Sequence, residues 1–179
     1  WVNWAGEQRC APAAIERPAD EDAVSECVRQ SAGRGATVRA VGSGHSFTDI
    51  ACTDGVMVDL GAMQRILDID RRTGRVTVEG GIKLHALALQ LAEHGLALAN
   101  QGDIDRQSIA GAISTATHGT GLRLQNLSAQ IVGMRLCTAT GAVRELSDAT
   151  DRDAVRAARV SLGALGIITA VTIQTVPLY

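Results

Sequence analysis

The stretch VGSGHSF, residues 41–47, places two glycines, two serines and a histidine directly after an apolar segment. Glycine permits close approaches that a Cβ forbids, and successive amides in such a turn can point at one anion. Ser43 and Ser46 add hydroxyl donors. These residue types predict a cradle for a diphosphate, with a tight surface turn as the alternative interpretation.

Two common nucleotide-binding loops do not fit this stretch. A dinucleotide-binding G-x-G-x-x-G motif needs a glycine where Phe47 stands, and no helical pattern begins immediately after it. A Walker A loop contains Gly-Lys-Ser or Gly-Lys-Thr, which the sequence lacks. The loop therefore belongs to neither class.

Two further stretches carry glycines beside apolar residues. SIAGAISTATHGTGLR, residues 108–123, surrounds an apolar stripe with hydroxyls and three glycines, so a ligand could lie against its N–H and O–H donors. The alternative is a helix that uses small residues to pack closely on a sheet. SLGALGIITAVTIQTVPLY, residues 161–179, is a glycine-broken turn followed by a β-branched run, which by itself is typical of a core strand.

The histidines and cysteines predict no metal site. His85 and His94 are separated by about 900° of helical rotation, so they lie on opposite faces of a predicted helix. His45 and His118 lie in glycine-rich loops that the sequence alone does not bring together. No pair of cysteines has CxxC spacing, so we expect buried or half-buried thiols at Cys10, Cys27, Cys52 and Cys137.

Composition narrows the class of protein. With 179 residues, of which 46% are hydrophobic, the chain can bury a core as one domain. The net charge of -2 and the scattered charges exclude a nucleic-acid footprint. No apolar run reaches membrane-spanning length, and WVNWAGEQRC lacks the pattern of a secretion signal. We expect a soluble, cytoplasmic protein, and membrane association stays open.

The elements that position these stretches follow from periodicity and capping. A strand over 14–17, a helix capped by Asp20 and ended by Gly33 or Gly35, and strands over 36–42 and 56–60 predict a small parallel sheet. Further along we expect a hairpin around 72–74, a core-facing helix over 83–95, a loop over 100–108, a short helix over 109–116, strands over 131–140, 143–146 and 167–176, and a helix over 153–160. The predicted class is α+β with two lobes. About residues 1–60 form the small parallel sheet with helices, and about residues 61–179 form a larger mixed or antiparallel sheet with helices.

Three motifs taken in order carry a family resemblance. RAVGSGHSF, GDIDRQSIAGAISTATHGTG and SLGALGIITAVTIQTV together resemble the FAD-binding (PCMH-type) domain of the vanillyl-alcohol oxidase flavoproteins. Within that family they are most similar to aldonolactone oxidoreductases, such as gulonolactone and arabinonolactone oxidases, and to alditol oxidases. The initial WVNWAG, followed by RPADEDAV, resembles the same subgroup.

The resemblance implies FAD as the cofactor and assigns residues to it. In many members the histidine that matches His45 is bonded to the flavin 8α-methyl carbon, and in others the flavin is bound without a covalent bond. Asp103 and Asp105 stand where relatives often have small neutral residues. The cofactor-binding residues carried over are Arg39, Val41, Gly42, Ser43, Gly44, His45, Ser46, Gly102, Asp103, Ser108, Ile109, Gly111, Ala112, Ser114, Thr115, Thr117, His118, Gly119, Gly121, Gly166, Ile167 and Ile168.

The implied activity is flavin-dependent oxidation of the carbinol of a sugar lactone or polyol, by hydride transfer to flavin N5 with reoxidation by oxygen or another acceptor. Family members continue into a C-terminal substrate or cap domain that supplies the catalytic base. We therefore expect this chain to need that domain or a partner subunit, and we assign no catalytic residue. His118 is a candidate base, with ordering of its glycine loop as the favoured interpretation. The alternatives are a noncovalent FAD enzyme of the same fold with another substrate, such as the reductase of peptidoglycan precursor synthesis, and a non-catalytic nucleotide-binding module.

Overall fold

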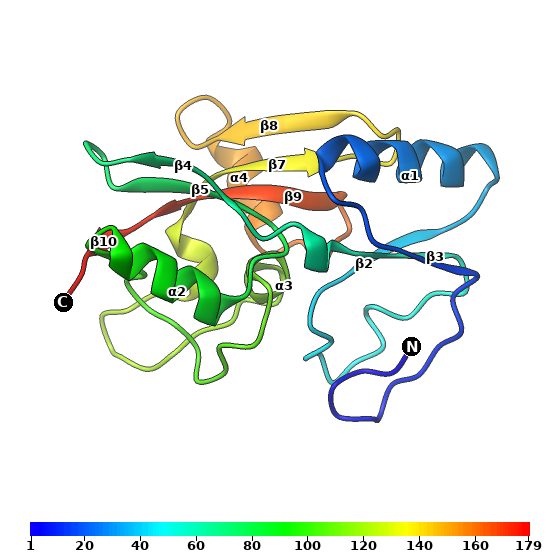
Figure 1. Ribbon diagram of the computed structural model, residues 1–179, viewed down its shortest axis with the longest axis horizontal. Coiled ribbons are helices and arrows are strands. Elements are labelled where there is room, and N and C mark those ends of the chain that lie inside the picture. The colour runs from blue at the N-terminus through cyan, green and yellow to red at the C-terminus, as the bar shows by residue number, and fades with distance from the viewer.

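A computed structural model describes residues 1–179 and contains two main β-sheets that lie beside one another along the long axis of the molecule (Figure 1). The smaller sheet has three parallel strands in the order β1-β3-β2, namely β1 (Ala14–Glu16), β3 (Val56–Asp59) and β2 (Val38–Val41). The predicted small parallel sheet is confirmed.

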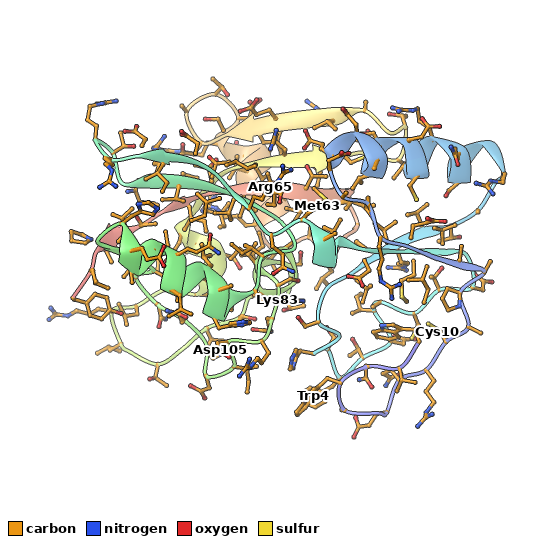
Figure 2. All side chains as sticks on the ribbon, in the orientation of Figure 1. Trp4, Cys10, Met63, Arg65, Lys83 and Asp105 are labelled. Carbon is orange, nitrogen blue, oxygen red and sulfur yellow. The ribbon has the colours of Figure 1, made fainter.

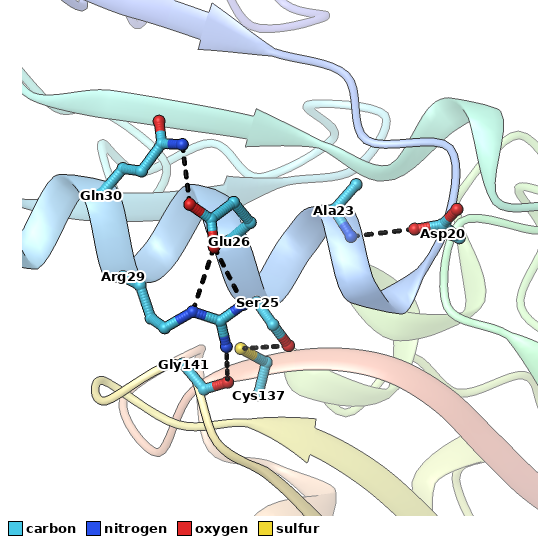
Figure 3. Close-up of polar contacts among 8 residues, drawn as sticks. All are labelled: Asp20, Ala23, Ser25, Glu26, Arg29, Gln30, Cys137 and Gly141. Atoms are coloured by element: carbon cyan, nitrogen blue, oxygen red, sulfur yellow. Dashed lines mark hydrogen bonds and ion pairs between the residues drawn. The ribbon is translucent and has the colours of Figure 1, made fainter.

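Helix α1 (Glu21–Gly33) connects β1 to β2 and begins where the sequence predicts. The side chain of Asp20 accepts a hydrogen bond from the amide of Ala23 at 2.9 Å, which satisfies a donor of the first turn (Figure 3). Val24 and Val28 are buried on the inner face of the helix. Arg29 donates to the carbonyl of Gly141 at 3.4 Å, so α1 also contacts the second sheet.

The larger sheet has five strands in the order β4-β5-β9-β7-β8, and every neighbouring pair is antiparallel. The strands are β4 (Ile66–Asp70), β5 (Arg75–Glu79), β7 (Ile131–Cys137), β8 (Val143–Ser147) and β9 (Ile167–Gln174). The predicted α+β class is confirmed, and of the two arrangements expected for this sheet the antiparallel one is observed.

Three helices pack on the larger sheet. They are α2 (Leu84–Glu93), α3 (Ile109–Ser114) and α4 (Arg152–Arg159). Leu84, Leu87 and Leu91 of α2 are completely buried in one cluster with residues of the other two helices and the sheet. The core-facing role predicted for α2 is therefore confirmed. None of the helices has the length and apolar character needed to cross a bilayer.

Several short elements were not predicted. The two-residue strands β6 (Leu96–Ala97) and β10 (Val176–Pro177) pair with each other, and two turns of 3-10 helix, η1 (Leu60–Ala62) and η2 (Leu127–Gln130), connect longer elements. The strand expected over 131–140 ends at Cys137, because the chain turns there. The amide of Gly141, a glycine with φ +75°, donates to the carbonyl of Thr138. The strand expected over 167–176 ends at Gln174, where Thr175 donates to the carbonyl of Gly74.

Candidate functional site

A cavity of about 320 Å³ opens where the end of the small sheet meets the larger sheet and its helices. One wall is the loop that follows β2, residues 42–47, and another is the segment leading into and through α3. The turn before β9 and the segment between β5 and α2 complete it. Stretches that are far apart in the sequence therefore line one cavity.

The loop 42–47 presents unpaired amides to this cavity. None of its backbone N–H groups donates to a backbone carbonyl. Gly44 has φ +66°, a conformation that favours glycine. All six residues line the cavity, and their N–H groups have no hydrogen-bond partner within the protein.

Gly42 lets the loop approach α3 closely. A Cβ on Gly42 would overlap the hydroxyl oxygen of Ser108, the residue that precedes α3. Ser108 is itself buried, with 3% of its surface exposed. Because Gly42 has no side chain, the loop of the first motif can pack directly against the start of the second motif at Ser108.

The N-terminal segment holds the loop from the other side. The amide of Trp4 donates to the carbonyl of Gly44 at 2.9 Å, and the side chain of Asn3 donates to the carbonyl of Ser46 at 3.0 Å. The side chain of Gln8 donates to the carbonyl of Phe47 at 2.9 Å. These bonds use the carbonyls of the loop and leave its amides free.

His45 stacks on Trp4 with ring centroids 5.2 Å apart and an interplanar angle of 26°. Burial lowers the pKa of His45, and the nearby charge of Lys83 lowers it further. The imidazole is therefore neutral at neutral pH, and a neutral imidazole keeps one nitrogen lone pair. The structure thus presents an oriented, neutral histidine at the cavity wall.

Lys83 was not predicted and is the only lysine or arginine that lines the cavity. Its ammonium donates to the hydroxyl oxygen of Ser43 at 2.8 Å, and Ser43 donates to the carbonyl of Arg106 at 2.6 Å. Burial lowers the pKa of Lys83, and the carboxylate of Asp59 opposes this shift only in part. Figure 2 shows Lys83 at the start of α2, with Trp4 on the N-terminal segment beyond it.

The predicted cofactor residues fall into three groups. Those in the cavity wall are Val41, Gly42, Ser43, Gly44, His45, Ser46, Ser108, Gly111, Ser114, Thr115, Gly166 and Ile168. Ile109, Ala112 and Ile167 are buried in the hydrophobic clusters, and Arg39 is exposed on β2. Both roles considered for the small residues of α3 are observed, since some pack in the core against the sheet and others line the cavity.

The third group lies in two loops outside the cavity wall and comprises Gly102, Asp103, Thr117, His118, Gly119 and Gly121. The two loops pack together, because a Cβ on Gly119 would overlap the carbonyl of Gln101. His118 is exposed and its Nδ1 donates to the carbonyl of Gly119 at 3.0 Å, which fits a role in ordering its loop. Asp103 and Asp105 are exposed.

The residues of the wall that sequence reasoning missed are mostly apolar or structural: Trp1, Phe47, Ile50, Leu60, Gly81 and Leu162. Phe47 and Ile50 directly follow the glycine loop, and this proximity was the one signal available. The others come from elements that only the fold brings near.

The fold and the cavity define the class of protein. Residues 12–147 match the sequence profile of the FAD binding domain, and the chain belongs to this family. The resemblance inferred from the three motifs is confirmed, and FAD is the cofactor of the family.

Three individual proteins show the similarity in more detail than the family does. L-gulono-1,4-lactone dehydrogenase of Mycobacterium tuberculosis is 63% identical over 179 residues, which is 100% of this chain and 41% of that protein. L-gulonolactone oxidase of Mus musculus is 42% identical over 175 residues, covering 98% of this chain and 40% of the relative. D-arabinono-1,4-lactone oxidase of Eremothecium gossypii is 38% identical over 181 residues, with 99% and 34% covered. The chain thus spans 41% or less of the length of these relatives.

A solved structure supports the fold. An alkyldihydroxyacetonephosphate synthase superposes with a TM-score of 0.86 over 96% of this chain and 33% of the other, at 22% identity. At that identity the likeness concerns the arrangement of the elements alone.

The residues of the cavity fit FAD. Free amides of the loop 42–47 suit a diphosphate, and the apolar side chains of Val41, Leu60 and Ile168 suit a flat ring system. Ser114 and Thr115 add hydroxyls at the wall, although each already donates to a carbonyl of its own helix. No carboxylate lines the cavity to repel the phosphates.

Proposed function

We propose that this chain is the FAD-binding part of an oxidoreductase that oxidises a carbinol of a sugar lactone. The observation that carries the proposal is the loop 42–47, whose amides lie unpaired in a cavity of a chain 63% identical to a lactone dehydrogenase. FAD, when bound, supplies the acceptor for a hydride from the substrate carbon. The printed names of the relatives favour a lactone over a polyol.

The chain's own residues position the cofactor. In this proposal the amides of residues 42–46 bind the diphosphate, and Gly42 and Gly111 let the loop and α3 pack closely around Ser108. Gly166 and Ile168 line the same cavity from the start of β9. The remaining residues carried over from the resemblance, on β2 and in the loops 102–103 and 117–121, complete the proposed set from outside the wall.

We further propose that His45 is the point of covalent attachment to the flavin. Its neutral imidazole, held against Trp4, has the lone pair that a nucleophile needs. The bond would replace one C–H bond of the flavin 8α-methyl carbon, whose proton would be released to solvent. The two electrons would remain on the flavin and then pass to oxygen. After acid precipitation of the FAD-loaded chain, flavin absorbance should stay in the pellet. In the His45→Ala variant it should appear in the supernatant. Flavin released from the unaltered chain would leave His45 as a noncovalent neighbour.

The remainder of the reaction lies outside this chain in our proposal. Two lobes, about 1–60 and 61–179, bind FAD, and a C-terminal substrate domain or a partner subunit supplies the substrate base. Oxygen or another acceptor then takes the electrons. The boundary near residue 60 is supported by the end of β3 at Asp59 and the start of β4 at Ile66. A cytoplasmic location is supported by four cysteines that are all free thiols.

Two measurements test the proposed function. The purified 179-residue chain should bind FAD and show flavin absorbance. A protein that joins this chain to its substrate domain should lose that absorbance when L-gulono-1,4-lactone is added without oxygen. Comparison of oxygen consumption with dye reduction then identifies the acceptor. A chain that takes up no FAD, or a holoenzyme that no sugar lactone reduces, would rule the proposal out.

A further inference from the structure

Lys83 is a partly buried cation without an anionic partner. It takes part in none of the ion pairs of the structure. The carboxylate that influences it, Asp59, already pairs with Arg17 at 3.3 Å and accepts from the amide of Gly61. Burial of a positive charge costs free energy unless a negative charge or polar acceptors compensate it.

Only one of the three N–H groups of the Lys83 ammonium has an acceptor within the protein, the hydroxyl oxygen of Ser43. Ser43 in turn is held by its bond to the carbonyl of Arg106. The ammonium is therefore fixed beside the loop 42–47 with two donors left over. Since Lys83 lines the cavity, these donors are available to a molecule inside it.

We propose that Lys83 supplies the positive charge that neutralises the diphosphate of FAD, acting together with the free amides of the loop 42–47. The inference rests on FAD binding by this chain. It adds a side-chain cation to a cradle that the sequence motif describes as backbone amides and hydroxyls. Three observations favour a negatively charged ligand. Lys83 forms no salt bridge, no carboxylate lines the cavity wall, and the amides of the loop 42–47 are free.

The first test measures the FAD dissociation constant of three variants by quenching of flavin fluorescence. Lys83→Met keeps the apolar stem and removes the charge, and should bind FAD about tenfold more weakly or worse. Lys83→Arg keeps the charge in a different shape and should recover part of the loss. The matched control is Arg144→Met, which removes an exposed, unpaired cation from β8 and should bind as the unaltered chain does.

Ionic strength separates charge from packing. Added salt screens the attraction between Lys83 and a phosphate, so the difference between the unaltered chain and Lys83→Met should shrink as salt is raised. Equal FAD affinities for these two proteins at low salt, or a loss in Arg144→Met as large as in Lys83→Met, would overturn the inference.

A second measurement uses the fact that Lys83 is the only lysine in the sequence. Biosynthetic labelling with ¹³C-lysine marks this side chain alone and leaves its three N–H groups in place. The resonance of its ε-carbon should shift on titration with FAD. A resonance that does not move at saturating FAD would overturn the inference and leave the proposed function intact. Failure of the unaltered chain to bind FAD at all would overturn both.

Discussion

At the scale of single residues, Gly42 and His45 show two ways in which one loop serves a ligand. Gly42 contributes by lacking a side chain, since its Cα lies where a Cβ would overlap Ser108. His45 contributes an imidazole whose orientation is set by stacking on Trp4. A glycine and a histidine in one short loop thus meet separate physical needs, close approach and a positioned lone pair.

Substitution of Gly42 by alanine tests the close approach. The new methyl group would push the loop away from Ser108, so we expect a stability loss of about 1–3 kcal/mol and FAD binding weakened at least about tenfold. Urea unfolding and FAD titration measure the two effects. Gly33→Ala is the control, because a Cβ there meets nothing within 4 Å, and it should be neutral or slightly stabilising. Unchanged FAD affinity in Gly42→Ala would contradict the account.

The lowered pKa of His45 predicts a pH dependence of stability. In the unfolded chain the imidazole titrates near its ordinary pKa of about 6.5, whereas burial and Lys83 lower the pKa in the folded chain. The unfolded state therefore binds more protons between the two values, and stability is lost as the pH falls through that range. Urea unfolding of the FAD-free chain between pH 5 and pH 8 measures this effect. The free energy of unfolding should fall less at low pH in His45→Gln than in the unaltered chain. Identical pH profiles would show that His45 is not buried enough to matter.

At the scale of elements, the N-terminal segment acts as a brace for the loop 42–47. It meets the loop through backbone and side-chain hydrogen bonds and through the ring of Trp4, which also contacts Phe47 edge to face with centroids 6.4 Å apart. The brace and the loop are separated by the whole of β1, α1 and β2 in the sequence. The geometry of the cradle therefore depends on a segment that carries no ligand-binding motif.

Removal of the Trp4 ring tests the brace. Because Trp4 is 64% exposed, Trp4→Ala should change the free energy of unfolding little, yet it should loosen His45 and weaken FAD binding by about two- to tenfold. A change in the ring resonances of His45 should accompany the weaker binding, because the stacked ring of Trp4 is lost. Leu89→Ala, which removes another exposed apolar side chain, from α2, should alter neither quantity. Normal FAD affinity in Trp4→Ala would show that the hydrogen bonds suffice.

At the scale of the whole molecule, the relation between the two sheets decides the shape of the cavity. Glu21, in the first turn of α1, accepts a hydrogen bond from the hydroxyl of Thr169 on β9 and pairs with Arg135 on β7 at 3.3 Å. Thr169 is 1% exposed, so this contact lies inside the junction. The helix of the small sheet is thereby fixed to the central strands of the large one.

Substitution of Glu21 by alanine should loosen this junction. Thr169 would keep only its hydrogen bond to the carbonyl of Arg135 at 3.3 Å, and Arg135 would lose its ion-pair partner. We therefore expect a stability loss of about 0.5–1.5 kcal/mol and weaker FAD binding, because walls of the cavity come from both sides. Asp22→Ala is the matched control, since it removes an exposed carboxylate from the same first turn of α1. Equal losses in the two variants would assign the effect to the helix terminus instead of the junction.

Much of the fold followed from local patterns in the sequence. Asp20 as a cap, the leucines at helical spacing in α2 and the β-branched run of β9 specify their elements through short-range chemistry. All three elements are present, although β9 and α2 are shorter than predicted. Elements of two residues, such as β6 and β10, have no periodicity to read, so they could not be predicted. Their pairing depends on chain segments that the fold brings together.

The candidate site divides in the same way. The sequence by itself determined that residues 41–47 form a glycine loop with hydroxyls and a histidine, because these properties belong to the residues and their order. Only the tertiary structure decided that Trp4 stacks on His45, that Lys83 reaches Ser43, and that the loops containing Gly102 and Gly119 lie outside the cavity wall. Contacts across dozens of residues depend on how two sheets pack, and no local pattern of residue types encodes that packing.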